Sequence, residues 1–173
     1  QNTALVTFSV RENQLTTLDV TKNTSLTGLW FHTNQISSID VSQNILLEGI
    51  GFENNLIVEI DLSKNNTLTR VYVNNNNLEK INLKNGANGL ITDINFNDNI
   101  NLNCVEVDDV SYATTNWTNI SDAANYRLDC FVEPVTVAIP DTNFEQALID
   151  LGLDSNGLNG NILEVEVDTI TKL

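Results

Sequence analysis

The stretch that decides the fold is LTGLWFHTNQISSIDVSQNIL, residues 26–46. It contains the pattern L-x-x-L-x-L-x-x-N twice, with Ile and Val replacing Leu in the second copy: Leu26, Leu29, Phe31, Asn34, then Ile36, Ile39, Val41, Asn44. The leading apolar position recurs at intervals of 21, 21, 21 and 23 residues, at Leu5, Leu26, Leu47, Leu68 and Ile91. A fixed period of this length is typical of solenoid proteins, whose units bury their apolar faces only against one another. The sequence therefore predicts a stack of coils over residues 1–101.

Each coil has two halves, and each half places apolar residues two positions apart. This alternation is typical of a strand with one face inward. Because a half-coil of ten or eleven residues leaves no room for a helix, we expect a flattened solenoid with short parallel strands on both faces, coils about 4.8 Å apart. The residues expected to line one continuous core are Leu29, Phe31, Val41, Ile50, Phe52, Ile60, Val71 and Val73.

Asparagine also follows the repeat. It recurs in the first half-coils at Asn13, Asn34, Asn55, Asn76 and Asn99, and in the second at Asn23, Asn44 and Asn65. Stacked Asn side chains can hydrogen-bond the turn backbone of a neighbouring coil. The next second-half position is Gly86, beside a two-residue insertion in NGANG (residues 85–89). We expect the array to loosen there.

These motifs resemble the leucine-rich repeat family in its short bacterial form, which carries a nested half-repeat. The family motif is matched from Leu5, Leu26, Leu47 and Leu68, and more loosely from Ile91. The resemblance implies a mostly β, right-handed solenoid with an irregular cap.

Residues 102–131 contain both cysteines, Cys104 and Cys130. Their disulfide would close a loop of about 26 residues and stabilise the fold by roughly 3 kcal/mol; two free thiols are the alternative. The pattern N-x-x-L-x-C-x-x-V-D-D resembles the C-terminal cap of secreted bacterial leucine-rich repeat proteins. Aromatic and apolar residues suited to covering the last coil are Tyr112, Trp117, Ile120 and Tyr126. A disulfide is typical of an oxidising compartment, so we expect a secreted or cell-surface protein.

Residues 132–140 carry both prolines and are predicted to be an extended connector. In residues 141–173, Asp141 or Thr142 would cap a short helix that ends at Gly152. Its apolar face would consist of Phe144, Leu148 and Leu151. The phrase IPDTNFEQALIDLGLDS resembles the N-terminal cap of a second repeat array. Because Gln1 falls within a repeat, we expect the chain to be a piece of a larger protein.

The net charge and hydropathy of the chain argue against some classes of binding partner. The net charge is −15, from 8 basic and 23 acidic residues, which argues against nucleic acid or an anionic membrane as the partner. The sequence also lacks an apolar run near the roughly 20 residues of a spanning helix. We therefore expect no membrane insertion.

The two strand faces differ in how much they vary from coil to coil. The outward second-half positions are nearly constant, at Asp19, Asp40, Asp61 and Asn82, whereas the equivalent first-half positions vary, at Ser9, Trp30, Gly51 and Tyr72. A scaffold keeps what folding requires, so the variable face is the candidate recognition surface. Its predicted binding residues are Arg11, Trp30, His32, Glu53, Arg70 and Tyr72. Exposed Trp, Tyr and Arg are typical of interface hot spots; the alternative is that the aromatics simply suit a strand.

Trp30 is expected to lean on the Gly51 position, where no side chain intervenes, and to leave a shallow groove between itself and Tyr72. The Asp19–Asp40–Asp61 ladder stacks like charges, and it would be explained by a bound cation or by local hydrogen bonds to the following turn. The second explanation is favoured, because the family repeats carry Asp there as a structural feature.

Residues 154–166 resemble a calcium loop, with Asp154, Asn156, Asn159 and Glu166 as its ligands. The match needs one inserted residue, which favours a plain Asn-Gly turn, and we expect no cofactor. His32 is the only histidine, so neither a zinc site nor a catalytic triad can be assembled. We expect a protein that is not an enzyme.

The leading hypothesis is a non-catalytic extracellular module that mediates protein–protein interaction or adhesion through the variable strand face. The first alternative is a glycan-binding accessory module of a secreted polysaccharide-processing or adhesive protein, because aromatic side chains stack on sugar rings. The second alternative is a structural spacer.

Overall fold

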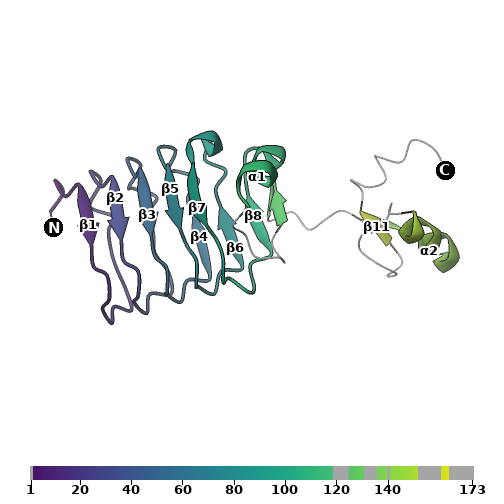
Figure 1. The fold of residues 1–173 in the computed structure, drawn as a ribbon, viewed down its shortest axis with the longest axis horizontal. Helices are drawn as coiled ribbons and strands as arrows, with labels where there is room; N and C mark the ends of the chain where they lie inside the picture. Colours follow the sequence, from purple (N-terminus) through teal and green to yellow (C-terminus); the bar gives the residue numbers. More distant parts are fainter. Residues whose placement is uncertain (1, 119–124, 131–135, 140, 152–160, 164–173) are drawn as a thin grey trace. The chain divides into compact units, whose positions relative to one another are not determined.

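The structure is a computed structural model that describes residues 2–118, 125–130, 136–139, 141–151 and 161–163. The chain divides into two compact units, residues 1–130 and 131–173, which are taken separately here. In the first unit the chain winds as a solenoid of stacked coils (Figure 1). Among the helices in the described part of the chain, none is both long and apolar enough to cross a membrane.

One side of the solenoid is a five-stranded parallel sheet, here called the front sheet. Its strands, in spatial order, are β1 (Thr7–Ser9), β2 (Gly28–Trp30), β3 (Gly49–Gly51), β5 (Arg70–Tyr72) and β7 (Asp93–Asn95). The register advances by one repeat per strand, so that Leu29 pairs with Ile50 and Ile50 with Val71. Equivalent positions of successive coils therefore lie side by side.

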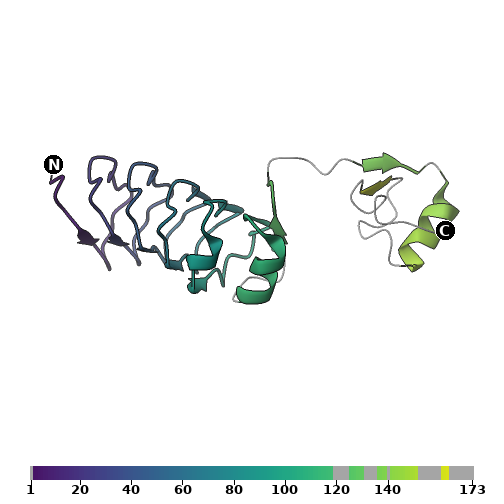
Figure 2. The same cartoon turned by 90° about the horizontal axis from the view of Figure 1, so that it is seen from above.

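The opposite side carries a four-stranded parallel sheet, here called the back sheet. Its strands are β4 (Glu59–Asp61), β6 (Lys80–Asn82), β8 (Cys104–Glu106) and β9 (Asn125–Arg127). Figure 2 shows the coils from above, with the two sides joined by turns. The predicted parallel strands on both faces are confirmed, although the back sheet begins only at Glu59.

All eight residues predicted to point inward are buried in one continuous cluster between the two sheets. Phe31 and Phe52 stack on each other, with ring centroids 5.5 Å apart. Ile60 contributes to the same cluster from the back sheet. The inward register predicted from the alternation is confirmed.

Buried asparagines join neighbouring coils through backbone hydrogen bonds. Asn55 Nδ2 donates to the carbonyl oxygens of Phe31 (3.1 Å) and Phe52 (3.0 Å), and its Oδ1 accepts from the Ile36 amide (3.0 Å). Asn34 and Asn76 make the same set of bonds one coil earlier and one coil later. Each ladder Asn thus satisfies backbone groups that burial removes from water.

The second asparagine ladder does not stop where the sequence suggested. Asn65 Nδ2 donates to the carbonyl oxygens of Val41 and Asn44 in the preceding coil. In the next coil Asn85, not the residue at position 86, donates to the carbonyl of Asn65 at 3.0 Å. Gly86 has a φ of +76°, a backbone conformation that glycine adopts without a steric penalty. The ladder hydrogen bond that Gly86 cannot make is therefore made by Asn85, and the ladder continues through this coil.

The end of the solenoid is covered by residues 102–118 and 125–130. The 3-10 helix η1 (Asn88–Leu90) and the short helix α1 (Val110–Asn116) lie at this end, and the latter is a regular element in a segment expected to be irregular. Asp109 caps α1 by accepting from the Tyr112 amide at 3.0 Å. Trp117, which directly follows α1, is buried. The Nε1 of Trp117 donates to the Ile91 carbonyl at 3.1 Å.

Cys104 and Cys130 form a disulfide, with their Cα atoms 5.9 Å apart. This confirms the predicted bond and rules out the alternative of two free thiols. Tyr126 packs against the core as predicted, and its hydroxyl donates to the Trp117 carbonyl at 2.6 Å. Tyr112, a third predicted cover, also packs against the core. Ile120, the fourth, lies outside the described residues.

The second unit contains the helix α2 (Thr142–Asp150) and an antiparallel pair, β10 (Thr136–Ala138) and β11 (Asn161–Leu163). β10 lies within the segment that the sequence predicted to be a connector. The predicted short helix is confirmed, and Asp141 is its cap, since its side chain accepts from the amides of residues 143 and 144. Of its three predicted apolar residues, Leu148 is buried, whereas Phe144 and Leu151 are exposed. Position 152 is not among the described residues.

Candidate functional site

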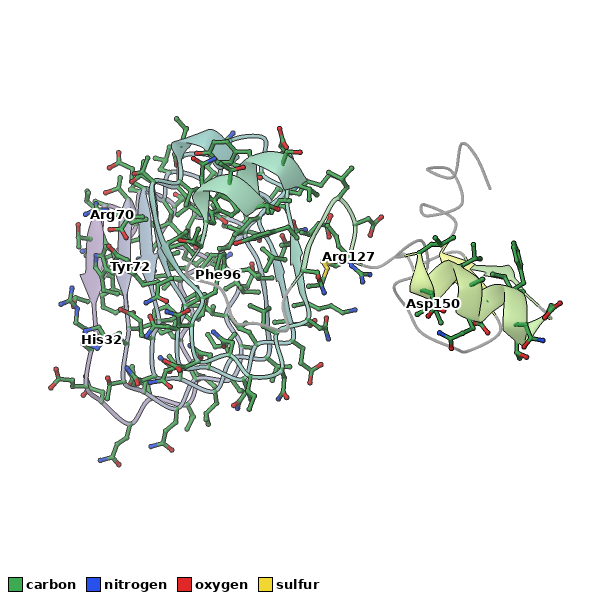
Figure 3. All side chains as sticks on the ribbon, turned by 45° about the vertical axis from the view of Figure 1, so that its right-hand side comes forward. His32, Arg70, Tyr72, Phe96, Arg127 and Asp150 are labelled. Carbon is green, nitrogen blue, oxygen red and sulfur yellow. A yellow bond between two sulfur atoms is a disulfide. The ribbon has the colours of Figure 1, made fainter. Side chains whose placement is uncertain are left out.

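The predicted binding residues lie on the outward side of the front sheet or directly after its strands. Trp30 ends β2, and Arg70 and Tyr72 flank the inward Val71 on β5. Arg11, His32 and Glu53 lie two residues beyond the ends of β1, β2 and β3. Figure 3 shows His32, Arg70 and Tyr72 along one side of the solenoid, with Arg127 at the opposite end of the same unit.

Trp30 lies across two glycines of the next coil. A Cβ atom built at Gly51 would be 2.7 Å from Cε3 of Trp30, and one at Gly49 would be 2.9 Å from its Cζ2. Real Cβ atoms essentially never approach so closely, so the indole occupies space that exists only because both positions are glycine. Gly49 and Gly51 are buried, and the indole is half-buried.

The groove expected between Trp30 and Tyr72 is absent at this point of the sheet. The two ring centroids are only 6.2 Å apart, with their planes inclined by 35°. This separation is within the range of direct aromatic contact. The expectation was wrong because the indole itself fills the gap that Gly51 leaves.

Two arginines from different coils lie against the same indole. The guanidinium carbon of Arg11 is 5.9 Å from the Trp30 ring centroid, and that of Arg70 is 5.8 Å from it. Both distances fit cation–π contact. Both arginines are exposed, and within the described part of the chain neither guanidinium donates a hydrogen bond or forms an ion pair. Arg11, Trp30, Arg70 and Tyr72 are here called the Trp30 cluster.

Carboxylates border this cluster. The Tyr72 hydroxyl donates to Asp93 on β7, and this bond, together with partial burial, raises the pKa of Tyr72 above its ordinary value. Glu53 Oε2 lies beside Gly51, where it is buried and accepts no hydrogen bond from the residues that the structure describes. Sequence reasoning did not select Asp93, although its position next to Arg70 in the register was visible from the repeat.

His32 is half-buried, and its Nδ1 lies 3.4 Å from Oγ1 of Thr33. It has no ring or cation–π contact with the Trp30 cluster among the interactions of the described residues. The structure therefore brings Arg11, Trp30, Arg70 and Tyr72 together, places Glu53 at their edge, and leaves His32 beside them.

The outward aspartates on the other side are used locally. Asp19 Oδ1 accepts from both the amide (2.9 Å) and the hydroxyl (2.7 Å) of Thr21. Asp40 accepts from the Ser42 amide at 2.9 Å, and Asp61 makes the equivalent bond one coil later. Hydrogen bonds from Thr21 lower the pKa of Asp19, and those from Ser42 lower the pKa of Asp40. The local hydrogen bonds that the sequence predicted for the ladder are therefore confirmed.

Among the residues that the structure describes, no three His, Cys, Asp or Glu side chains are grouped so as to hold a metal ion. The calcium-loop candidates Asp154, Asn156, Asn159 and Glu166 lie outside those residues.

Comparison with known proteins identifies no family for this chain. No family model matches the chain, and no curated protein matches it. Among solved structures it is similar to one described as "Functional domain of InlJ from Listeria monocytogenes includes a cysteine ladder". The identity is 22%, the TM-score is 0.49, and the match covers 61% of this chain and 27% of that one. The chain thus spans about a quarter of that domain's length, and at this level the likeness says nothing about function.

Proposed function

We propose that this chain is a non-catalytic, extracellular protein-binding module whose partner contacts the front sheet around the Trp30 cluster. One observation carries the proposal. The outward positions that vary between coils gather four side chains into a single cluster, while the outward positions that stay constant are used in local turns. Tyr, Trp and Arg at the centre of a surface are the residue types that dominate binding energy at protein interfaces.

The surroundings of Trp30 favour a protein partner over a glycan. A sugar ring stacks on an aromatic side chain whose face is open. The Trp30 ring has a guanidinium within 6 Å of its centroid from each of two coils, and the ring lies against Gly49 and Gly51. A partner that offers hydrogen-bond acceptors and apolar side chains together fits this arrangement better than a stacked sugar does.

The extracellular part of the proposal rests on the Cys104–Cys130 disulfide. Stable disulfides form and persist in oxidising compartments and are rare in the cytosol.

The test is a pull-down from a surface-protein fraction with quantitative mass spectrometry, run beside a glycan array. Each uses the wild-type chain, Trp30→Ala, and the control Ile45→Ala, which removes an exposed apolar side chain elsewhere. We expect proteins that wild type and Ile45→Ala retain equally and that Trp30→Ala retains at least about tenfold less, a difference of 1.4 kcal/mol. Thermal melting of each variant separates loss of binding from loss of folding.

A Trp30-dependent signal on the glycan array would replace this proposal with the glycan-binding alternative. Failure of the folded wild-type chain in both assays would leave the spacer alternative.

A further inference from the structure

Two of the three arginines in the chain lie against one indole. This arrangement is unusual for a chain in which acidic residues greatly outnumber basic ones. The chain holds 23 acidic residues against 8 basic ones. A surface arginine therefore has many carboxylates with which it could form an ion pair. Arg11 and Arg70 nevertheless lie within 6 Å of the Trp30 ring centroid and, within the described part of the chain, pair with no carboxylate. Both guanidinium groups thus lie beside the indole without a hydrogen bond to the described residues.

A cation–π contact does not use up the N–H donors of a guanidinium. Its five donors lie in one plane in a fixed fork, and within the described part of the chain those of Arg11 and Arg70 make no hydrogen bond. That fork matches the two oxygens of a carboxylate, and the resulting charge-assisted bonds are about twice as strong as neutral ones. Because Trp30 already restricts both arginines, less side-chain entropy is lost when a carboxylate binds.

We propose that the Trp30 cluster is a receptor for a short acidic segment of a protein partner. Arg11 and Arg70 receive Asp or Glu side chains of that segment, and the exposed parts of Trp30 and Tyr72 contact apolar atoms between them. This inference rests on the proposed function and names the partner's chemistry.

The net charge of the first unit limits the length of such a ligand. Residues 1–130 hold 15 acidic and 7 basic residues, and this net charge of −8 repels an extended polyanion along the solenoid, whereas salt at physiological strength screens interactions beyond about 8 Å. A segment with one or two carboxylates feels mainly the two arginines. Glu53 borders the cluster, and Asp93 is already bonded to Tyr72. These two carboxylates disfavour any further negative charge on the ligand.

The experiment pans a random 12-residue peptide display library against the full chain and measures the affinities of the selected peptides. The variants are Trp30→Ala, Arg11→Gln, Arg70→Gln and Arg70→Lys, and the control is Arg127→Gln. Arg127 is the third arginine, exposed on β9 of the back sheet, so its substitution makes the same change in net charge away from the cluster. A pectin-derived oligogalacturonate is added as a competitor, because uronates carry the same carboxylate chemistry on a glycan.

We expect the peptides that depend on Trp30 to be enriched in Asp and Glu relative to the unselected library. Arg11→Gln and Arg70→Gln should each weaken their binding by roughly 10- to 100-fold, and Arg127→Gln should change it less than about twofold. Arg70→Lys keeps the charge but not the planar fork, so it should recover only part of the loss. Raising the salt concentration should weaken binding.

Trp30-dependent peptides without acidic enrichment, or with equal affinity for Arg70→Gln, would overturn this inference and leave the proposed function standing. Peptides that ignore Trp30→Ala would overturn both. Competition by the oligogalacturonate with the same arginine dependence, at concentrations below those of the peptides, would move the ligand from an acidic peptide to an acidic glycan.

Discussion

The front and back of the solenoid are built from the same repeat but use their outward positions in opposite ways. On the back, Asp19, Asp40 and Asp61 each bond to the residue two positions ahead. On the front, Trp30 instead contacts residues of other coils, with Arg11 in the preceding coil and Arg70 two coils further on. The constant outward aspartates thus mark local turns, and Trp30 marks contacts between coils that no single repeat contains. Asn95, at the equivalent position of β7, makes a local bond instead, because its Oδ1 accepts from the Asn97 amide at 3.0 Å.

The comparison also shows what the two faces share. Inward residues of both sheets belong to one cluster, in which Phe52 from the front and Ile60 from the back are both buried. The difference between the faces is therefore confined to the surface. Three predictions, taken from the core outward, test whether the two faces share one core and differ only at the surface.

The largest effect is expected in the shared core. Phe52→Ala should lower the free energy of unfolding by about 3–5 kcal/mol and Ile60→Ala by about 2–5 kcal/mol, because each leaves a cavity in a close-packed interior. Chemical denaturation measures both, with Val58→Ala as an exposed apolar control that should change stability by no more than about 0.5 kcal/mol. A loss below about 1 kcal/mol for Ile60→Ala alone would mean that the back strands do not rest on the same core.

The front surface should show coupling between coils. Gly51→Ala is expected to cost about 1–3 kcal/mol, because its Cβ would lie 2.7 Å from Cε3 of Trp30. In a Trp30→Ala background the same change should cost at least about 1 kcal/mol less, as a double-mutant cycle would show. Gly89→Ala is the matched control, since an added Cβ there meets nothing within 4 Å. Equal costs in both backgrounds would mean that the indole does not lie on Gly51.

The back surface should show only a small dependence on pH. The folded-state pKa values of Asp19 and Asp40 are lowered from an ordinary value of 3.8. These carboxylates therefore contribute stability above pH 3.8, and the contribution is lost as the pH falls below 3.8 through the folded-state values.

The double variant Asp19→Asn/Asp40→Asn should flatten the dependence of the melting temperature on pH between about 5 and 2.5. Asn82 shows that an Asn side chain keeps the turn bond, because its Oδ1 accepts from the Lys84 amide at 2.9 Å. An acid-induced decrease in melting temperature that is as steep in the variant as in wild type would remove these two carboxylates from the explanation.

The period and the alternation of apolar residues were enough to predict the inward register, because they depend only on spacing along the chain. The same spacing placed Trp30, Arg70 and Tyr72 on one face correctly. The missing side chain at position 51 also predicted that Trp30 leans there, and the structure confirms this. Spacing along the chain could not show that the indole then reaches contact with Tyr72, since the reach of a side chain is set by the space around it. The predicted groove was wrong for this reason.

The end of the array was harder to predict because the strict period stops there. A two-residue insertion moves the ladder bond from position 86 to Asn85. The helix α1 depends on a cap by Asp109, in a segment without the apolar periodicity by which helices are recognised. The disulfide, in contrast, followed from the presence of only two cysteines in one short cap and from the resemblance of that cap to a known one.

That disulfide has a mechanical consequence. A tensile load that enters the first unit through Cys130 crosses the S–S bond to Cys104 and continues into β8, which is one of the paired strands of the back sheet. The intervening residues, including α1 and β9, lie outside the load path. The disulfide thereby prevents about 90 Å of chain from being extended. The cap over the last coil stays in place while the chain beyond it is under load.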